Sequence, residues 1–256
     1  MKIYHGLGDK PRFERGVATL GSFDGVHCGH RALLAEVRRR AAMQGVESVV
    51  YTFEPHPRIT LRCAEGLKLL NTTAEKAVLL EAEGIDNIVF IPFTEEFSRL
   101  SPQAFISDYI VACGIGTLVV GFNHRFGRDK QGDYAYLSSS HQPLWPEVVE
   151  VEQQFIGDEK VSSTILRQVI ACGDMARARC MLGRDYIFAG SADGSGRVVS
   201  DDPQYKLLPP AGRYRAVING CKCTVCISDD GGVTADIPTG RDERVYINIG
   251  VKYADL

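Results

Sequence analysis

The amino-acid sequence predicts an α/β domain with a parallel sheet, followed by a small all-β module. Strand-like and helix-like segments alternate through the first two thirds of the 256 residues, which is typical of a parallel sheet covered by helices on both faces. Beyond about residue 190, helical signals become rare and short β-rich runs replace them. Hydrophobic residues make up 45% of the chain and charged residues 24%, so the composition is that of a globular protein with a sizeable core.

The strands expected in the first region are short apolar runs that end at a glycine or a proline. The run that begins at Gly16 is almost wholly apolar and stops at Gly21, as a buried strand does. The run that begins at Ser48 is ended by Pro55 and Pro57, because proline cannot donate to a strand ladder. Strands are expected at residues 16–21, 48–53, 88–91, 117–121 and 148–151.

The expected helices are recognised by apolar spacing and by capping residues. Leu33, Leu34, Val37 and Ala41 recur at helical spacing before a stop at Gly45. The other helices each open on a residue whose side chain is suited to cap the first turn, namely Thr72, Ser101, Ser162 and Asp174. Helices are expected at residues 29–43, 72–84, 101–113, 162–172 and 174–182.

The region after residue 190 is expected to form the all-β module. Its β-rich runs lie at residues 213–219, 223–227 and 244–250, with loop-like segments before them. A module of about 65 residues buries little surface by itself, so we expect it to pack on the first domain.

Three of the eight cysteines, Cys221, Cys223 and Cys226, stand close together. They could supply thiolates to zinc, but a closed structural zinc site needs a fourth ligand, and no histidine or cysteine follows Cys226. We therefore interpret the segment as a β-strand with Cys221 and Cys223 on one face, and the sequence does not identify any metal ligand.

Charge and hydropathy exclude several classes of partner. A net charge of −3 gives no general attraction for phosphate backbones, so nucleic acid is not an expected partner. The apolar runs are far shorter than the roughly 20 residues that span a bilayer, so no membrane contact is expected. The polar start, Met-Lys-Ile-Tyr-His, is unlike a signal peptide. We expect a cytoplasmic protein, and the sequence does not indicate its oligomeric state.

The densest group of chemically versatile residues is Gly21-Ser-Phe-Asp-Gly-Val-His-Cys-Gly-His30, between a strand and a helix. Its glycines permit a tight turn that brings backbone N–H groups close to a ligand. His27 and His30 are three residues apart, so both can face one site at the helix N-terminus. Hydrogen bonds and positive potential there suit a pentavalent phosphorus transition state. The alternative, a glycine-rich turn with incidental histidines, is less favoured because two of only six histidines lie here.

A second candidate phosphate-binding group is Ser163, Thr164 and Arg167. The two hydroxyl residues stand at an expected helix start, where unpaired N–H groups favour an anion. Arg167 lies one turn further along and can bind phosphate through two N–H groups. For Ser163 and Thr164 alone, an ordinary helix cap remains the alternative.

The pattern His27-Cys-Gly-His30 resembles the signature of the nucleotidylyltransferase superfamily, whose members have a Rossmann-like sheet. Three further segments narrow the resemblance to the bacterial FAD synthetase family, the bifunctional riboflavin kinase/FMN adenylyltransferases. They are Thr52-Phe-Glu-Pro-His-Pro57, Gly121-Phe-Asn-His-Arg-Phe-Gly127 and Val161-Ser-Ser-Thr-Ile-Leu-Arg167. All occur in the family's order, and the resemblance covers about residues 12–188.

This resemblance implies an FMN adenylyltransferase domain at residues 1–188, which would transfer AMP from ATP, with Mg²⁺, to FMN and give FAD and pyrophosphate. His27 and His30 would stabilise the transition state, and Arg167 with Ser163 and Thr164 would hold the leaving pyrophosphate. Asn123 would contact the flavin or its phosphate, and no role follows for His124. Further contacts to ATP or flavin are expected from Gly21, Ser22, Phe23, Asp24, Gly29, Phe53, His56, Pro57 and Arg125.

The same resemblance makes residues 189–256 a truncated, riboflavin-kinase-like β-barrel module. The family's Pro-Thr-Ala-Asn motif is missing, and residues 200–208 stand in its place. Glu243 is the one carboxylate of the catalytic type left in this region, so riboflavin kinase activity is predicted to be absent. Two other functions remain open at this point: another adenylyl or cytidylyl transfer by the same superfamily, and a flavin- or nucleotide-binding regulator without turnover.

Overall fold

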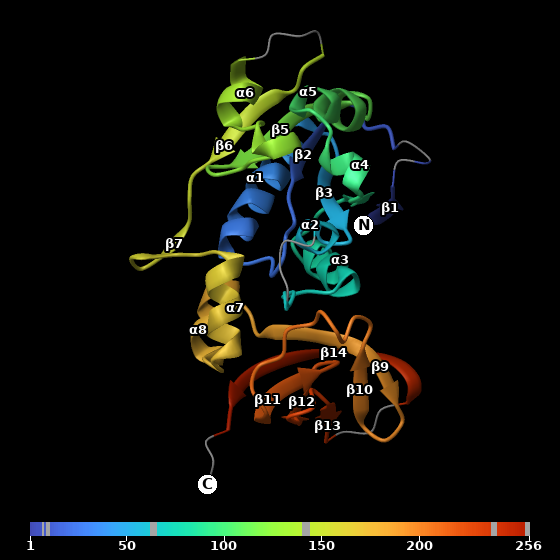
Figure 1. Ribbon diagram of the computed structural model, residues 1–256, viewed down its shortest axis with the longest axis vertical. Helices are drawn as coiled ribbons and strands as arrows, with labels where there is room; N and C mark the ends of the chain where they lie inside the picture. The colour runs from blue at the N-terminus through green and yellow to red at the C-terminus, as the bar shows by residue number, and fades with distance from the viewer. Residues whose placement is uncertain (7, 9–10, 62–65, 140–143, 237–239, 254–256) are drawn as a thin grey trace. The chain divides into compact units, whose positions relative to one another are not determined.

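The computed structural model describes residues 1–6, 8, 11–61, 66–139, 144–236 and 240–253 (Figure 1). The chain forms two compact units, and each is assembled from separate stretches of sequence. The α/β unit consists of residues 1–23, 29–65 and 79–154, and the barrel unit of residues 24–28, 66–78 and 155–256.

The α/β unit contains a six-stranded sheet in the order β1-β4-β3-β2-β5-β6, and every neighbouring pair is parallel. Consecutive residues of the central strands, such as Val17 and Ala18, are both fully buried, so both faces of the sheet are covered. This is the predicted fold. The strands are β1 (Lys2–His5), β2 (Gly16–Leu20), β3 (Ser48–Glu54), β4 (Asn87–Pro92), β5 (Ile115–Gly121) and β6 (Glu147–Val151).

The strand order contains a switch point beside β2. From β2 the chain adds β3 and then β4 on one side, and it later returns to place β5 on the other side. Ligands of open α/β sheets bind at the carboxyl ends of the strands that flank such a point. The segments that begin at Gly21 and at Phe122 follow these two strand ends.

The first helix and the caps agree with the sequence predictions. Helix α1 (Cys28–Gln44) buries the four predicted residues, Leu33, Leu34, Val37 and Ala41. At the start of α3 (Thr73–Ala82), Thr72 Oγ1 accepts from the Glu75 N–H at 3.3 Å, and Glu75 accepts from the Thr72 N–H at 3.0 Å. Ser162 and Asp174 cap α7 (Ser163–Ala171) and α8 (Met175–Leu182) as predicted. The other helical turns are α2 (Pro57–Thr60), α4 (Glu95–Ser98), η2 (Arg128–Lys130) and α6 (Tyr134–Ser139).

The expected single helix at residues 101–113 takes a different form. Ser101 caps α5 (Pro102–Phe105), but the chain then widens into the π-helical segment η1 (Ile106–Val111). Phe105, Ile106 and Ile110 are all buried in the core of the unit. The wider turn is also seen in the bond from the Ala112 N–H to the Ser107 carbonyl, five residues back, at 3.0 Å.

The barrel unit contains a closed antiparallel barrel in the order β10-β13-β12-β11-β14-β9 (Figure 1, orange to red). Its interior shares one hydrophobic core with the buried side chains of α7 and α8. The strands are β9 (Tyr186–Asp193), β10 (Arg197–Ser200), β11 (Gly212–Ile218), β12 (Cys221–Ile227), β13 (Val233–Ala235) and β14 (Arg241–Lys252), and a hairpin of β7 (Phe155–Ile156) and β8 (Glu159–Lys160) precedes α7.

The all-β module is therefore confirmed, and the three β-rich runs of the sequence correspond to β11, β12 and β14. Cys221, Cys223 and Cys226 lie on β12 as free thiols, whereas Cys63 falls outside the described residues. The predicted boundary between residues 188 and 189 falls within β9 and stays a prediction. Of the helices that the structure describes, none is both long and apolar enough to cross a bilayer.

Strands β9 and β10 approach each other closely at Gly190. A Cβ atom at this position would lie 2.1 Å from the Val199 carbonyl oxygen, a distance at which the strands must separate. We expect Gly190→Ala to lower the free energy of unfolding by about 2 kcal/mol or more, measured by urea denaturation. Gly121→Ala is the control, because a Cβ there meets no described atom within 4 Å. Equal stability of the two variants would contradict the prediction.

Candidate functional site

The residues predicted for one site are divided between the two units. The barrel unit holds Asp24, His27, Ser163, Thr164 and Arg167. The α/β unit holds Gly21, Ser22, Phe23, Gly29, His30, Phe53, His56, Pro57, Asn123 and Arg125.

The turn that follows β2 has an unusual backbone. Phe23, Gly25 and Val26 have φ angles of +47°, +96° and +40°. Glycine adopts such angles freely, but a β-branched residue such as valine does so only when its surroundings impose them. Backbone of this kind is frequent at ligand-binding sites. We refer to residues 24–28 as the 24–28 loop.

Asp24 is the first anchor of the 24–28 loop. Its side chain is almost fully buried, and its Oδ1 accepts from the backbone N–H groups of Leu70 at 2.9 Å and Asn71 at 3.0 Å. Its Oδ2 forms an ion pair with Arg167 Nη2 at 2.5 Å. Its carbonyl oxygen accepts from the Ser163 hydroxyl at 2.7 Å. Asp24 therefore ties the loop to Ser163 and Arg167, two of the three predicted phosphate-binding residues of α7.

Arg184 is a second anchor, and the sequence analysis missed it. Its Nη2 donates to the Gly25 carbonyl at 2.9 Å and its Nη1 to the Val26 carbonyl at 3.0 Å. The guanidinium thus holds the two carbonyls of the residues with positive φ. Its partners are backbone atoms, and such contacts leave no motif in a sequence.

His27 is buried in the 24–28 loop, with 6% of its surface exposed. Burial lowers the pKa of its imidazole to about 4, and nearby Arg184 acts in the same direction, while Asp24 opposes them. His27 is therefore neutral at pH 7. The positive potential expected from this imidazole is supplied in the barrel unit by Arg167 and Arg184 instead, and His27 offers hydrogen bonding.

His30 lies in the first turn of α1, which begins at Cys28. Its ring is tilted by 56° against that of Phe23, with centroids 5.2 Å apart. The first N–H groups of an α-helix have no partner within the helix and attract anions. The position of His30 agrees with the predicted role, which stays a prediction.

Phe53 and His56, predicted to wall a flavin pocket, have local structural partners. Phe53 contacts the rings of Phe93 and Phe97, with centroids 5.3 and 5.8 Å away. His56 caps α2, because its Nδ1 accepts from the Arg58 N–H at 3.2 Å and Pro57 opens the helix. A cavity of about 380 Å³ lies at the ends of β1 and β4 and shares Phe97 with this aromatic cluster; it is lined by Gly6, Pro92, Thr94, Glu96, Phe97, Leu100 and Tyr109.

The segment after β5 presents Asn123 and Arg125 at the surface. Arg125 forms an ion pair with Asp133, so a bound phosphate would compete with that carboxylate. His124 stacks on Phe126 with ring centroids 5.7 Å apart, and burial lowers the pKa of His124 to about 4. Asn123 is exposed, and its contact with the flavin or its phosphate stays a prediction.

Metal-binding side chains do not cluster in the part of the chain that the structure describes: no three His, Cys, Asp or Glu residues there are placed to hold one ion. Both carboxylate oxygens of Asp24 are already engaged.

The amino-acid sequence is similar to those of one known protein family. The sequence model described as FAD synthetase matches residues 9–165. Three similar proteins, all named bifunctional riboflavin kinase/FMN adenylyltransferase, come from Listeria monocytogenes (34% identity over 72% of this chain and 59% of the relative), Pseudomonas fluorescens (35%, 74% and 61%) and Escherichia coli K12 (32%, 77% and 61%). The chain thus spans about three fifths of the length of these relatives.

A solved structure shares the whole fold. The crystal structure described as a macrolide-efflux protein from Streptococcus pneumoniae superposes with a TM-score of 0.82, over 100% of this chain and 91% of that one. The two sequences are 23% identical, so this similarity supports the architecture alone.

The neutral state of His27 makes stability depend on pH. In the unfolded chain the imidazole has its ordinary pKa of 6.5, and in the folded chain about 4. Between these values the unfolded state binds the extra proton, so stability falls as pH falls from 6.5 towards 4. When the pH is lowered from 7 to 5, protonation of His27 in the unfolded state should reduce the free energy of unfolding of wild type by about 2 kcal/mol. The variant His27→Gln should not show this loss.

Urea unfolding of both proteins at several pH values checks this prediction. Between pH 7.5 and 9 the imidazole is neutral in both states, so the difference between the two proteins should stay constant there. His124 titrates in both proteins and cancels in the comparison. Parallel curves from pH 7 down to pH 5 would contradict the assignment.

Proposed function

We propose that this chain, which belongs to the FAD synthetase family, transfers the AMP group of ATP to FMN and releases pyrophosphate. One observation carries the proposal. The Nε atom of Arg167 is buried and finds no hydrogen-bond acceptor among the described residues, although the same guanidinium is fixed by Asp24. A buried donor without an acceptor is costly, and a phosphate oxygen beside the N-terminal turns of α7 would satisfy it.

The reaction needs no strong base. A phosphate oxygen of FMN is already ionised, so it attacks the α-phosphorus of ATP directly. The new P–O bond forms as the bond between the α-phosphorus and the bridging oxygen breaks, and that oxygen leaves with pyrophosphate. Negative charge grows on the non-bridging oxygens, where fixed hydrogen-bond donors stabilise it.

The proposed roles of the residues differ with their charge. His27, neutral at pH 7, would donate a hydrogen bond to a non-bridging oxygen, as would His30 at the start of α1. Arg167 and Thr164 would hold the leaving pyrophosphate. Ser163 would contribute through Asp24, because its hydroxyl already bonds the Asp24 carbonyl. On the flavin side we retain Asn123, Phe53, His56 and Pro57 as proposed contacts.

We also propose a role for Mg²⁺ and a cellular location. Mg²⁺ enters as part of the MgATP co-substrate, since this ion keeps several waters and binds mainly to phosphates. We retain ATP and FMN as the partners and the cytoplasm as the location, and a net charge of −3 gives no general attraction for nucleic acid.

We also propose that the barrel does not phosphorylate riboflavin. Residues 200–208, which replace the expected kinase motif, are committed to structural contacts: Lys206 and Leu207 are buried, and the Asp202 N–H donates to Ser200 Oγ at 3.4 Å. The Glu243 carboxylate accepts from the Gly240 N–H at 2.6 Å, so it closes a turn.

The transferase proposal predicts FAD from FMN and MgATP with the purified chain, detected by chromatography. His30→Ala should reduce the rate about a hundredfold or more, as loss of a transition-state donor does. Pyrophosphate release with another phosphorylated acceptor but not with FMN would indicate a different nucleotidyl transfer. Binding of FMN and ATP without FAD would indicate a regulator, and either result would refute the proposal.

The kinase proposal predicts that riboflavin and MgATP give no FMN above the blank without protein. Supplying FMN to the same preparation is the positive control, because it must then yield FAD. Appearance of FMN at a rate proportional to protein concentration would overturn this prediction.

A further inference from the structure

We propose that Lys206, which lies between β10 and β11, is a positioning residue for the 24–28 loop and acts through Glu75 and Asn71. The inference rests on the proposed function, because that function assigns the loop to ATP. It gives the barrel a task in nucleotide binding that is independent of any chemistry of its own.

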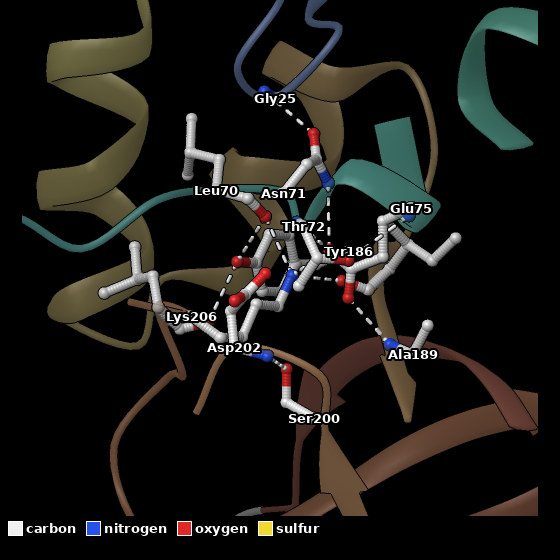
Figure 2. A network of polar contacts seen from close by, with 12 residues as sticks. Gly25, Leu70, Asn71, Thr72, Glu75, Tyr186, Ala189, Ser200, Asp202 and Lys206 are labelled. Carbon is white, nitrogen blue, oxygen red and sulfur yellow. Dashed lines mark hydrogen bonds and ion pairs between the residues drawn. The ribbon is translucent and has the colours of Figure 1, made fainter. Parts of the chain in front are cut away.

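The first step is the enclosure of Lys206. Its side chain is 1% exposed, and its ammonium group donates to Glu75 Oε2 at 2.6 Å and to the Leu70 carbonyl at 2.8 Å (Figure 2). It also donates to the Ile187 carbonyl at 2.8 Å. The three N–H groups are thus all used. The ammonium also lies 4.3 Å from the centroid of the Tyr186 ring.

Glu75 passes this contact on in two directions. Its Oε1 accepts from the Ala189 N–H of β9 at 2.7 Å. Its Oε2 accepts from Lys206, from the Thr72 N–H at 3.0 Å and from Asn71 Nδ2 at 3.4 Å (Figure 2). The buried carboxylate therefore joins the barrel strand to the start of α3.

Asn71 makes the last link to the loop. Its Oδ1 accepts from the Gly25 N–H at 2.8 Å (Figure 2), while its own backbone N–H donates to Asp24. The segments are also tightly packed, since a Cβ at Gly25 would lie 2.8 Å from a Leu70 methyl group. Turning the Asn71 amide would release Gly25, whose positive φ the loop depends on.

The charge of this link is informative. Burying an ion pair costs desolvation, and apolar residues of similar volume often stabilise a fold as well or better. An apolar pair cannot orient the Asn71 side chain. In the native pair the ammonium group fixes the carboxylate of Glu75, and that carboxylate fixes the Asn71 amide. Fold stability and loop position should therefore separate when the pair is replaced.

Two full-length variants separate these effects. Lys206→Met leaves Glu75 unpaired, and we expect a melting temperature lower by about 10 °C. The double variant Lys206→Met/Glu75→Leu should recover much of that loss but not the loop. Arg244→Met is the matched control, because it removes an ion pair with Asp201 in the same barrel and has no contact with Asn71.

Two readouts are taken at a temperature where circular dichroism shows every variant folded. Amide hydrogen exchange of residues 24–28 should be faster in both Lys206 variants than in wild type and Arg244→Met. The Kd for MgATP with a methylene group between the α- and β-phosphates should rise about tenfold in both Lys206 variants, and less than twofold in Arg244→Met.

Unchanged exchange and affinity in folded Lys206→Met would overturn the inference. So would a double variant that recovers affinity together with stability, because Lys206 would then be merely structural. If wild type binds the analogue but makes no FAD, the proposed transfer fails while the inference about the loop is still decided by exchange and affinity. If wild type does not bind the analogue, both proposals fail.

Discussion

The candidate site depends on one constraint: the backbone conformation of the turn after β2 is unfavourable by itself and needs contacts from other segments to be stable. Phe23 and Val26 take φ angles that side-chain-bearing residues avoid, so the conformation exists only because other groups impose it. Asp24 is held by two backbone amides and Arg167, and the carbonyls of Gly25 and Val26 are held by Arg184. A loop fixed in this way before substrate arrives pays little ordering entropy on binding.

Charge is distributed within the barrel unit in a way that suits a polyphosphate. Burial keeps His27 neutral, so it does not compete with the arginines for an anion or repel them. Arg167 and Arg184 supply the positive charge, and both are fixed by oxygen atoms of the same short loop. Position and charge are therefore set together, since a movement of the loop would also move the two guanidinium groups.

Local features of the sequence predicted much of the fold, and distant contacts account for what was missed. The apolar spacing in α1 and the caps of α3, α7 and α8 were predicted because each depends on residues within one or two turns. Glu75 completes the cap that was predicted at Thr72, but its partner Lys206 lies 131 residues away. Arg167 lies 143 residues from Asp24, so Asp24 was expected near ATP without the contact that explains its burial. The π-helical turn and the short strand β13 have no comparable local signal.

The interleaving of the two units sets an order on folding during synthesis. Residues 24–28 and 66–78 leave the ribosome early, yet Arg167, Arg184 and Lys206 belong to the last hundred residues. Because chains emerge from the N-terminus at about 5–20 residues per second, the loop spends several seconds without the groups that hold it. A nascent chain can complete its parallel sheet first, but the 24–28 loop acquires its working shape only as the barrel closes.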